Sequence, residues 1–439
     1  MHCLEDVSWA LANRRASSLE LVDAILADET EALFTLKLDQ RAQAGARAAD
    51  AARAAGDRRP LLGVPVTVKD NFDIGGVPTT AGSRLLADAS PAVQDAEAVR
   101  RLEAAGCVVV GRTNMTEFAF SGLGLNPHFG TPANPRFAGE PRITGGSSSG
   151  AALSVAGGVV AAALGTDTGG SVRIPAALCG LVGFKPTASA IPSSGLLPLS
   201  HTLDAIGVIA HRVGDCASLF DALRSDVPAA PEAGTRRLAI VETLVFDDAE
   251  PEVCEAIARA LGRLVDAGFA LERITMPLLD EIAGRMRSGT ISAAEAWAWH
   301  RPLIEDGGGP LYDPRVLSRI LGGRMVDEDG YAGLLAWRAD FAAVFAAIAD
   351  GFDALMWPTV PLVAPRIATL ADDDAYWRAN GLMLRNSTIA NLADGCAISV
   401  PCGGHPPVGL TLAAGRGRDD RLLRAAMAVE AALAPDRGR

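Results

Sequence analysis

The N-terminal residues alternate apolar and polar positions with a helical period. An apolar stripe occupies residues 21–26, and residues 42–55 are rich in alanine and arginine. Ser17 lies three residues before Glu20, which is the spacing of a helix-capping box. Residues 1–56 are therefore predicted to form N-terminal helices.

After residue 56 the period shifts between strand and helix. Residues 61–68 (LLGVPVTV) and 107–110 are short, β-branched runs typical of buried strands, and a helix is predicted over 95–105. The apolar run at 151–164 favours a buried core helix, and 178–184 favours another strand. This alternation predicts an α/β fold around a mostly buried sheet.

The second half continues with a different balance of elements. A helix is predicted over 212–224, a Pro/Ala linker over 225–234, and a mostly helical region over about 245–350 that breaks at 307–310. Strands are predicted again at 237–242, 354–356, 397–400 and 408–412, followed by a helix from 418. We predict one domain over 1–439, with a core at about 60–235 and 350–439.

Composition and charge exclude several classes of partner. The 439 residues are 49% hydrophobic and 21% charged, as in soluble globular proteins, and carry a formal net charge of −12. An acidic surface repels nucleic acid and anionic membranes. The apolar stretch at 151–165 is shorter than the roughly 20 residues of a membrane span. Neither nucleic acid nor membrane is expected as a partner.

The cysteines indicate the redox state of the thiols and the cellular location of the protein. Seven are scattered along the chain without CxxC spacing, which disfavours a zinc site or a disulfide framework. Reduced thiols predict a cytoplasmic protein, and no metal or cofactor is expected.

Three short segments carry candidate chemistry. Lys69 ends an apolar strand, where burial would lower its pKa and make it a base, unless it is a surface lysine at a strand end. Residues 144–150 (TGGSSSG) place three hydroxyls between glycines; the other interpretation is a flexible linker. Residues 165–175 (GTDTGGSVRIP) place Ser171 after two glycines, where successive backbone amides can converge as an oxyanion hole or simply form a turn.

The choice of base follows from what surrounds the serines. None of the six histidines lies in a segment of this kind, and no G-x-S-x-G elbow surrounds Ser171. A serine nucleophile with a desolvated lysine needs only Lys69.

Together these segments resemble the amidase signature family. The family is marked by a lysine after a G-x-P-[VI]-x-[VI] strand, a GGSSxG loop and a G-T-D-x-G-G-S-[IV]-R-x-P run, and all three occur here in the family's order. Similar stretches lie at 111–118, 179–187, 200–207 and 390–410. The resemblance covers nearly the whole chain and is weakest over about 235–350.

The resemblance implies roles for individual residues. Lys69 corresponds to the catalytic lysine, Ser147 to a bridging serine after a cis peptide bond from Gly146, and Ser171 to the nucleophile. It implies an oxyanion hole made by the backbone amides of Thr168, Gly169, Gly170 and Ser171. The implied fold is one α/β domain with a large, twisted mixed sheet covered by helices on both faces.

Several neighbouring residues have two interpretations. Arg173 is either a carboxylate clamp for substrate or an ion pair with Asp167 that braces the loop, and the second is favoured. Ser148 is expected to hydrogen-bond within the site. Asn114 and Thr116 either line the pocket or cap a helix. Core packing is favoured over ligand contact for four residues in the predicted pocket region: Trp297, Trp299, His300 and Trp357.

The predicted reaction is hydrolysis of a small-molecule linear carboxylic amide through an acyl-Ser171 intermediate, with release of ammonia or an amine. Alternatives are a urea-type hydrolase for biuret or allophanate derivatives, or an amidotransferase A-type subunit that uses glutamine. The Gly-Arg pair that many family members carry after KPT is missing at 187–192, which resembles the small-amide branch. Residues 384–391 lack the acidic residue that, by the resemblance, glutamine-using members of the family carry there to hold the glutamine amine. A homodimer is possible.

Overall fold

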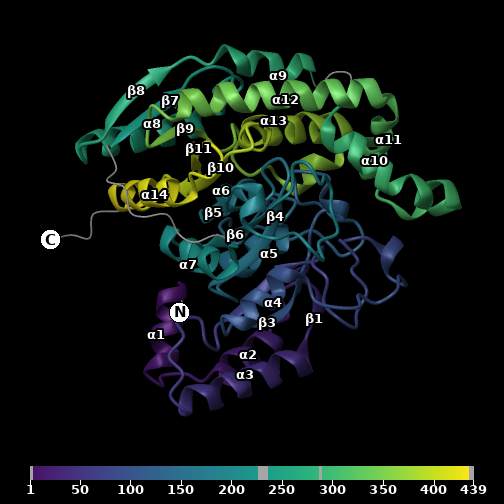
Figure 1. Ribbon diagram of the computed structural model, residues 1–439, viewed down its shortest axis with the longest axis vertical. Coiled ribbons are helices and arrows are strands. Elements are labelled where there is room, and N and C mark those ends of the chain that lie inside the picture. Colours follow the sequence, from purple (N-terminus) through teal and green to yellow (C-terminus); the bar gives the residue numbers. More distant parts are fainter. Residues whose placement is uncertain (1–2, 226–235, 286–288, 435–439) are drawn as a thin grey trace.

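Eleven strands form one mixed sheet in the computed structural model (Figure 1), which describes residues 3–225, 236–285 and 289–434. β2 pairs in parallel with β3 and β4, β7 pairs in parallel with β8 and β9, and the six remaining neighbours are antiparallel. The predicted α/β class is confirmed. In spatial order the strands are β1 (Phe34–Lys37), β3 (Val108–Thr113), β2 (Pro65–Lys69), β4 (Ala162–Asp167), β6 (Ala205–Ala210), β5 (Val182–Lys185), β10 (Cys396–Pro401), β11 (Gly409–Ala414), β9 (Ala354–Pro358), β7 (Arg237–Val241) and β8 (Ala270–Ile274).

Helices cover both faces of this sheet, because successive strand residues point to opposite sides. In β9, Leu355 and Trp357 enter one core, whereas Ala354 and Met356 enter the other. The first face carries α2 (Ser18–Leu26), α3 (Asp39–Ala54), α5 (Ser149–Ala156), α6 (Arg173–Cys179), α12 (Glu328–Ala349) and α13 (Asp373–Leu392). The opposite face carries α1 (Leu4–Ala12), α4 (Glu97–Ala104), α7 (Val213–Leu223), α8 (Pro251–Asp266) and α14 (Asp419–Leu433).

The N-terminal prediction is confirmed for the helices and wrong for one strand. The Ser17–Glu20 capping box is present at the start of α2. Between α2 and α3, however, Phe34–Lys37 forms the edge strand β1, which pairs antiparallel with β3. All four residues are half-buried. Because a run this short shows no clear strand period, the sequence pattern does not separate it from the helices on either side.

The core helix predicted over 151–164 is also wrong in its second half. α5 ends at Ala156, Gly157 and Gly158 follow, and β4 begins at Ala162. Gly158 has a φ of +75°, which a helix does not accommodate. β4 lies between β2 and β6 and is buried throughout, so its apolar run does not differ in period from a buried helix.

Residues 245–350 are mostly helical, as predicted, and contribute the outer wall of the molecule. α9 (Asp280–Arg285), α10 (Ile291–Leu303) and α11 (Pro314–Gly322) follow the missed edge strand β8. The predicted break coincides with a kink at Gly307, whose φ is +91°. Thr290 and Asp313 cap α10 and α11 by accepting backbone hydrogen bonds. The predicted linker at 225–234 lies, from residue 226 on, outside the described residues.

One helix in the described part of the chain, α12, is long and apolar enough to cross a membrane by length and composition. Only 17% of its most apolar window is buried. In Figure 1 it lies lengthwise beside α13 at one end of the molecule, and its buried residues Phe341, Phe345 and Ala349 pack into the core under the sheet. The absence of a membrane partner stays a prediction.

Candidate active site

The sheet topology brings the three chemically loaded segments to one edge. β2 and β4 are parallel neighbours, with Val68 opposite Leu164, so their carboxyl ends lie side by side. Lys69 ends β2, and the loop that carries Ser171 follows β4. The loop that carries Ser147 precedes α5, which packs against β2, β3 and β4.

Lys69 is fully buried at this edge. Its Nζ lies 2.8 Å from Ser147 Oγ and 2.8 Å from Thr166 Oγ1. Burial lowers the pKa of Lys69 to about 7, although the charges of Asp204 and Asp167 act in the opposite direction. A substantial fraction of Lys69 is therefore neutral at pH 7 and can accept a proton.

Ser147 and Ser148 connect Lys69 to the Ser171 loop. The Gly146–Ser147 peptide bond is cis, as the family resemblance implies. The backbone N–H of Ser148 donates to the carbonyl oxygen of Ser171 at 3.2 Å, and its hydroxyl donates to the Thr166 carbonyl at 3.3 Å. Ser148 thus ties the two loops together, which is the kind of hydrogen bonding predicted for it.

Asp167 and Arg173 form a buried ion pair that holds the Ser171 loop in place. Both side chains are fully buried, and Arg173 Nη2 lies 2.8 Å from Asp167 Oδ1. Asp167 also accepts the backbone N–H groups of Gly170 and Val172. Burial alone would raise the pKa of Asp167, but the charge and hydrogen bond of Arg173, with the Lys185 charge and an Asn391 hydrogen bond, hold that pKa well below its usual range. The geometry agrees with the favoured interpretation of Arg173 as a brace.

The backbone amides around Ser171 are available to different extents. The N–H of Gly170 donates to Asp167 Oδ1 at 2.9 Å, so this predicted donor is engaged. In the described part of the chain, no acceptor is found for the amides of Thr168, Gly169 and Ser171. Gly170 has a φ of +123°, and a Cβ there would lie 2.1 Å from Ser387 Oγ, so only glycine fits this turn.

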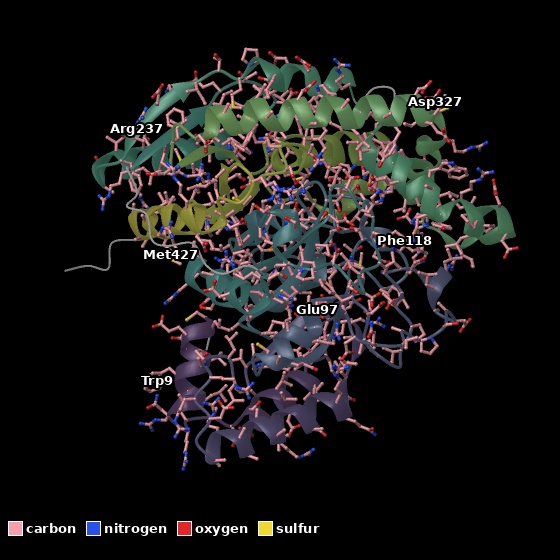
Figure 2. All side chains as sticks on the ribbon, viewed as in Figure 1. Trp9, Glu97, Phe118, Arg237, Asp327 and Met427 are labelled. Carbon is pink, nitrogen blue, oxygen red and sulfur yellow. The ribbon has the colours of Figure 1, made fainter. Side chains whose placement is uncertain are left out.

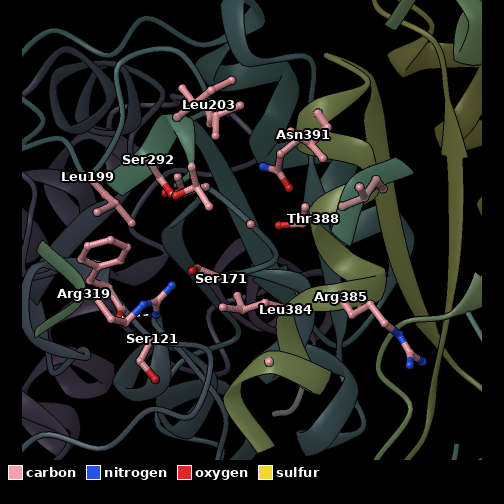
Figure 3. A pocket seen from close by; sticks show the side chains of 18 of the residues that line it. Ser121, Ser171, Leu199, Leu203, Ser292, Arg319, Leu384, Arg385, Thr388 and Asn391 are labelled. Carbon is pink, nitrogen blue, oxygen red and sulfur yellow. Dashed lines mark hydrogen bonds between the residues drawn. The ribbon is translucent and has the colours of Figure 1, made fainter. Parts of the chain in front are cut away.

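A cavity of about 310 Å³ opens onto Ser171 (Figure 3). Seven leucine and isoleucine side chains from five segments line it: Leu199, Leu203, Leu244, Ile282, Ile291, Leu384 and Leu392. Hydroxyl, amide and guanidinium groups complete it: Ser121, Thr168, Thr290, Ser292, Thr388, Asn391, Arg319 and Arg385. Among the described lining residues there is no Asp or Glu, and the pocket suits an apolar or anionic ligand better than a cation.

Sequence reasoning missed several residues of the site. Asp204 accepts the backbone N–H groups of Leu199 and Ser200 and the hydroxyl of Thr168, and burial raises its pKa to about 6. Asn391 donates to Asp167 Oδ1 at 3.0 Å and accepts from Arg173 at 2.7 Å. Asp204 lies in a stretch that resembles the family, but Arg319 lies in no motif, and only the packing of α11 brings it to the cavity.

Two residues with open interpretations hold loops together instead of lining the cavity. The amide of Asn114 donates to the carbonyls of Ala32 and Gly130. The backbone N–H of Thr116 donates to the Ser147 carbonyl, and Thr116 precedes a short 3-10 helix at Glu117–Ala119.

The aromatic residues weighed above pack against other side chains. None of Trp297, Trp299, His300 and Trp357 lines the cavity. Phe118, labelled in Figure 2, contacts the ring of His300 at 4.4 Å, and His300 Nδ1 lies 2.8 Å from Tyr312 Oη. Packing, the favoured interpretation, describes all four.

Comparison with known proteins identifies the family. The model of the family described as Amidase matches residues 20–423. The chain belongs to the amidase family. A 2-amino-5-chloromuconic acid deaminase from Comamonas testosteroni is 37% identical over 90% of this chain and 87% of its own length. An indoleacetamide hydrolase from Pseudomonas savastanoi is 32% identical over 98% of this chain and 96% of its own length. A crystal structure of an amidase superimposes with a TM-score of 0.87 at 29% identity, covering 98% of this chain and all of that one.

Membership fixes the reaction class. The chain is a hydrolase of the amidase family, whose members act on amide C–N bonds. Its relatives differ in the substrates for which they are named, so family membership does not select one.

Proposed function

We propose that this protein hydrolyses a linear carboxylic amide through an acyl-Ser171 intermediate and releases ammonia or an amine. The observation that carries the proposal is the buried contact of 2.8 Å between Lys69 Nζ and Ser147 Oγ, beside a cavity that exposes Ser171. A buried lysine without an ion pair is poised as a base.

The proposed proton path runs from Ser171 through Ser147 to Lys69. Neutral Lys69 accepts a proton from Ser147 while Ser147 accepts one from Ser171, whose Oγ bonds to the amide carbon. The C–N bond then breaks, and the proton returns through Ser147 to the leaving nitrogen. Water attacks the acyl ester by the same path, releasing the carboxylic acid and restoring Ser171.

The negative charge of the tetrahedral intermediate needs donors that are not already engaged. The amides of Thr168, Gly169 and Ser171 meet this condition, whereas Gly170 is held by Asp167. Backbone donors fixed before the reaction stabilise the oxyanion without reorganisation. The Asp167–Arg173 pair serves the reaction by holding this loop.

The cavity disfavours glutamine as the substrate. A glutamine carries an α-ammonium group that needs an acidic partner, and the described lining residues include none. Residues of α13 that face the cavity, such as Leu384 and Thr388, are neutral where an acid would be required. A urea-type substrate uses the same chemistry, and no lining residue favours it over a carboxylic amide.

Labelling and turnover test the proposal. A fluorophosphonate probe should label the wild-type protein at Ser171, and Ser171→Ala should lose both labelling and at least about 1000-fold in kcat while keeping its thermal midpoint. Ser292→Ala, which removes another hydroxyl from the same cavity, is the matched control and should still be labelled. Near-normal amide hydrolysis by Ser171→Ala would refute the proposal, and rapid ammonia release from glutamine would favour the amidotransferase interpretation.

A further inference from the structure

Arg319 extends from α11 into the wall of the cavity that contains Ser171. Its Nη1 donates to the carbonyl oxygen of Phe120 at 2.6 Å, and its guanidinium carbon lies 4.3 Å from the centre of the Phe120 ring. No ion pair is found for Arg319 among the described residues. In the view of Figure 3 its guanidinium extends in the direction of Ser171.

The other arginines nearby are already satisfied. Arg385 lines the same cavity, but its guanidinium turns away in Figure 3 and donates to the Asp247 carbonyl at 2.6 Å. Arg315, one helical turn before Arg319, pairs with Asp373 at 2.7 Å. Arg173 is paired with Asp167. Arg319 therefore differs from its neighbours in having donors directed at the cavity and no acidic partner.

Leaving a guanidinium without a counter-ion in an apolar wall costs free energy. Burial lowers the pKa of Arg319 to about 10, which still leaves the group charged at neutral pH. The described residues that line the cavity with it include no Asp or Glu to balance its charge. A carboxylate ligand would supply the missing charge and accept two parallel hydrogen bonds in the geometry that a guanidinium favours.

The position of Arg319 is fixed before any ligand binds. Asp313 caps α11, and its own backbone N–H donates to the buried Glu117 at 2.7 Å. The Phe120 ring and carbonyl hold the guanidinium itself. Such fixed donors lose little side-chain entropy on binding.

We propose that Arg319 binds a carboxylate group of the substrate, so that the substrate is an amide that also carries a carboxylic acid. The apolar wall between the two sites matches a short hydrocarbon spacer between the carboxylate and the scissile carbonyl. That the ligand is an amide substrate rests on the proposed function. The carboxylate site itself is a separate feature that a binding measurement can test.

Paired substrates test the preference. The monoamides of succinic, glutaric and adipic acid each differ from the corresponding diamide by one charge. For at least one chain length, the wild-type kcat/KM for the monoamide should exceed that for the diamide at least about tenfold, and Arg319→Met should lower the monoamide value about 100-fold, mainly through KM. The diamide value should change less than about fivefold. Arg315→Met is the matched control and should keep the wild-type preference.

Binding without turnover separates this inference from the amidase proposal. In the Ser171→Ala protein, calorimetry with succinate, glutarate and adipate should detect binding of at least one diacid, weakened at least about tenfold by adding Arg319→Met. Unchanged binding, or a monoamide preference that survives Arg319→Met, would overturn the carboxylate site and leave the amidase proposal intact. Diacid binding that depends on Arg319, without any amide hydrolysis, would support the site and refute the reaction.

Discussion

The nearest partners of the Lys69 amine are hydroxyl and carbonyl oxygens, and in the described part of the chain it forms no salt bridge. Its two closest contacts, Ser147 and Thr166, are neutral. Full burial then decides the protonation state, because a charged amine gains little solvation there. A residue that is ordinarily a cation is in this way converted into a base at neutral pH.

A pH profile should reveal this base. We expect kcat/KM for amide hydrolysis to rise as pH increases through about 7, because the folded-state pKa of Lys69 is lowered to about 7 and only its neutral form accepts the proton. Lys69→Met should lose at least about 1000-fold at every pH. The measurement is ammonia release between about pH 5.5 and 9 with a fixed amide.

The control for this profile is the thermal midpoint of both proteins over the same pH range. A wild-type profile that stays flat between about pH 6 and 8 would contradict the role of Lys69. The same conclusion would follow if Lys69→Met kept more than a few per cent of the activity.

At the scale of elements, α13 and the loop after β4 act as one unit. Ser387 donates to the carbonyl of Gly169 at 2.6 Å, and Asn391 contacts both members of the Asp167–Arg173 pair. The loop that carries Ser171 is therefore shaped by a helix more than 200 residues away in sequence. A change in this brace should affect stability and activity together.

Substituting one partner of the buried pair tests the brace. Arg173→Met leaves Asp167 charged and buried, and we expect it to lower the free energy of unfolding by about 3–5 kcal/mol and to abolish most activity. The double variant Asp167→Asn/Arg173→Met removes the uncompensated charge and should regain part of the stability but not the activity. Urea denaturation followed by circular dichroism measures both. Equal free energies of unfolding for the wild-type and Arg173→Met proteins would show that the ion pair does not stabilise the fold.

At the scale of the whole molecule, the accessibility of the cysteine thiols to solvent shows how completely the core is closed. Six of the seven cysteines are buried and only Cys254 is exposed. Burial raises the pKa of the Cys107, Cys179 and Cys402 thiols to about 12, so they are both inaccessible and protonated. The reduced state predicted from their spacing agrees with this arrangement.

Thiol titration should count them. Ellman's reagent should react rapidly with one thiol in the native protein and with seven after denaturation, because Cys254 alone meets solvent. Cys254→Ser should remove the rapid phase and leave amide hydrolysis unchanged. Two or more rapid thiols in the native protein, or fewer than seven after denaturation without reductant, would contradict the buried, reduced arrangement.

The homodimer and the cytoplasmic location stay predictions. Light scattering would measure the molar mass in solution and so test the homodimer.

The sequence by itself determined the α/β class and the three segments that bring chemistry to the site. It did so because glycines, hydroxyls and a strand-ending lysine are local features whose spacing survives in the folded chain. It also indicated the brace at Asp167 and Arg173. It failed where the local pattern is ambiguous: β1 is too short to show a period, and β4 is apolar on both faces like a buried helix.

Only the tertiary structure decided what surrounds Ser171. Arg319 belongs to no motif, and its place in the cavity depends on how α11 packs against Phe120 and Glu117. The pKa of Lys69 likewise depends on burial by strands and loops from several parts of the chain. Proximity between distant residues is a property of packing, and a linear pattern of residue types does not contain it. The sequence therefore predicted Ser171 as the nucleophile, and the fold supplied the arginine from which we infer the substrate.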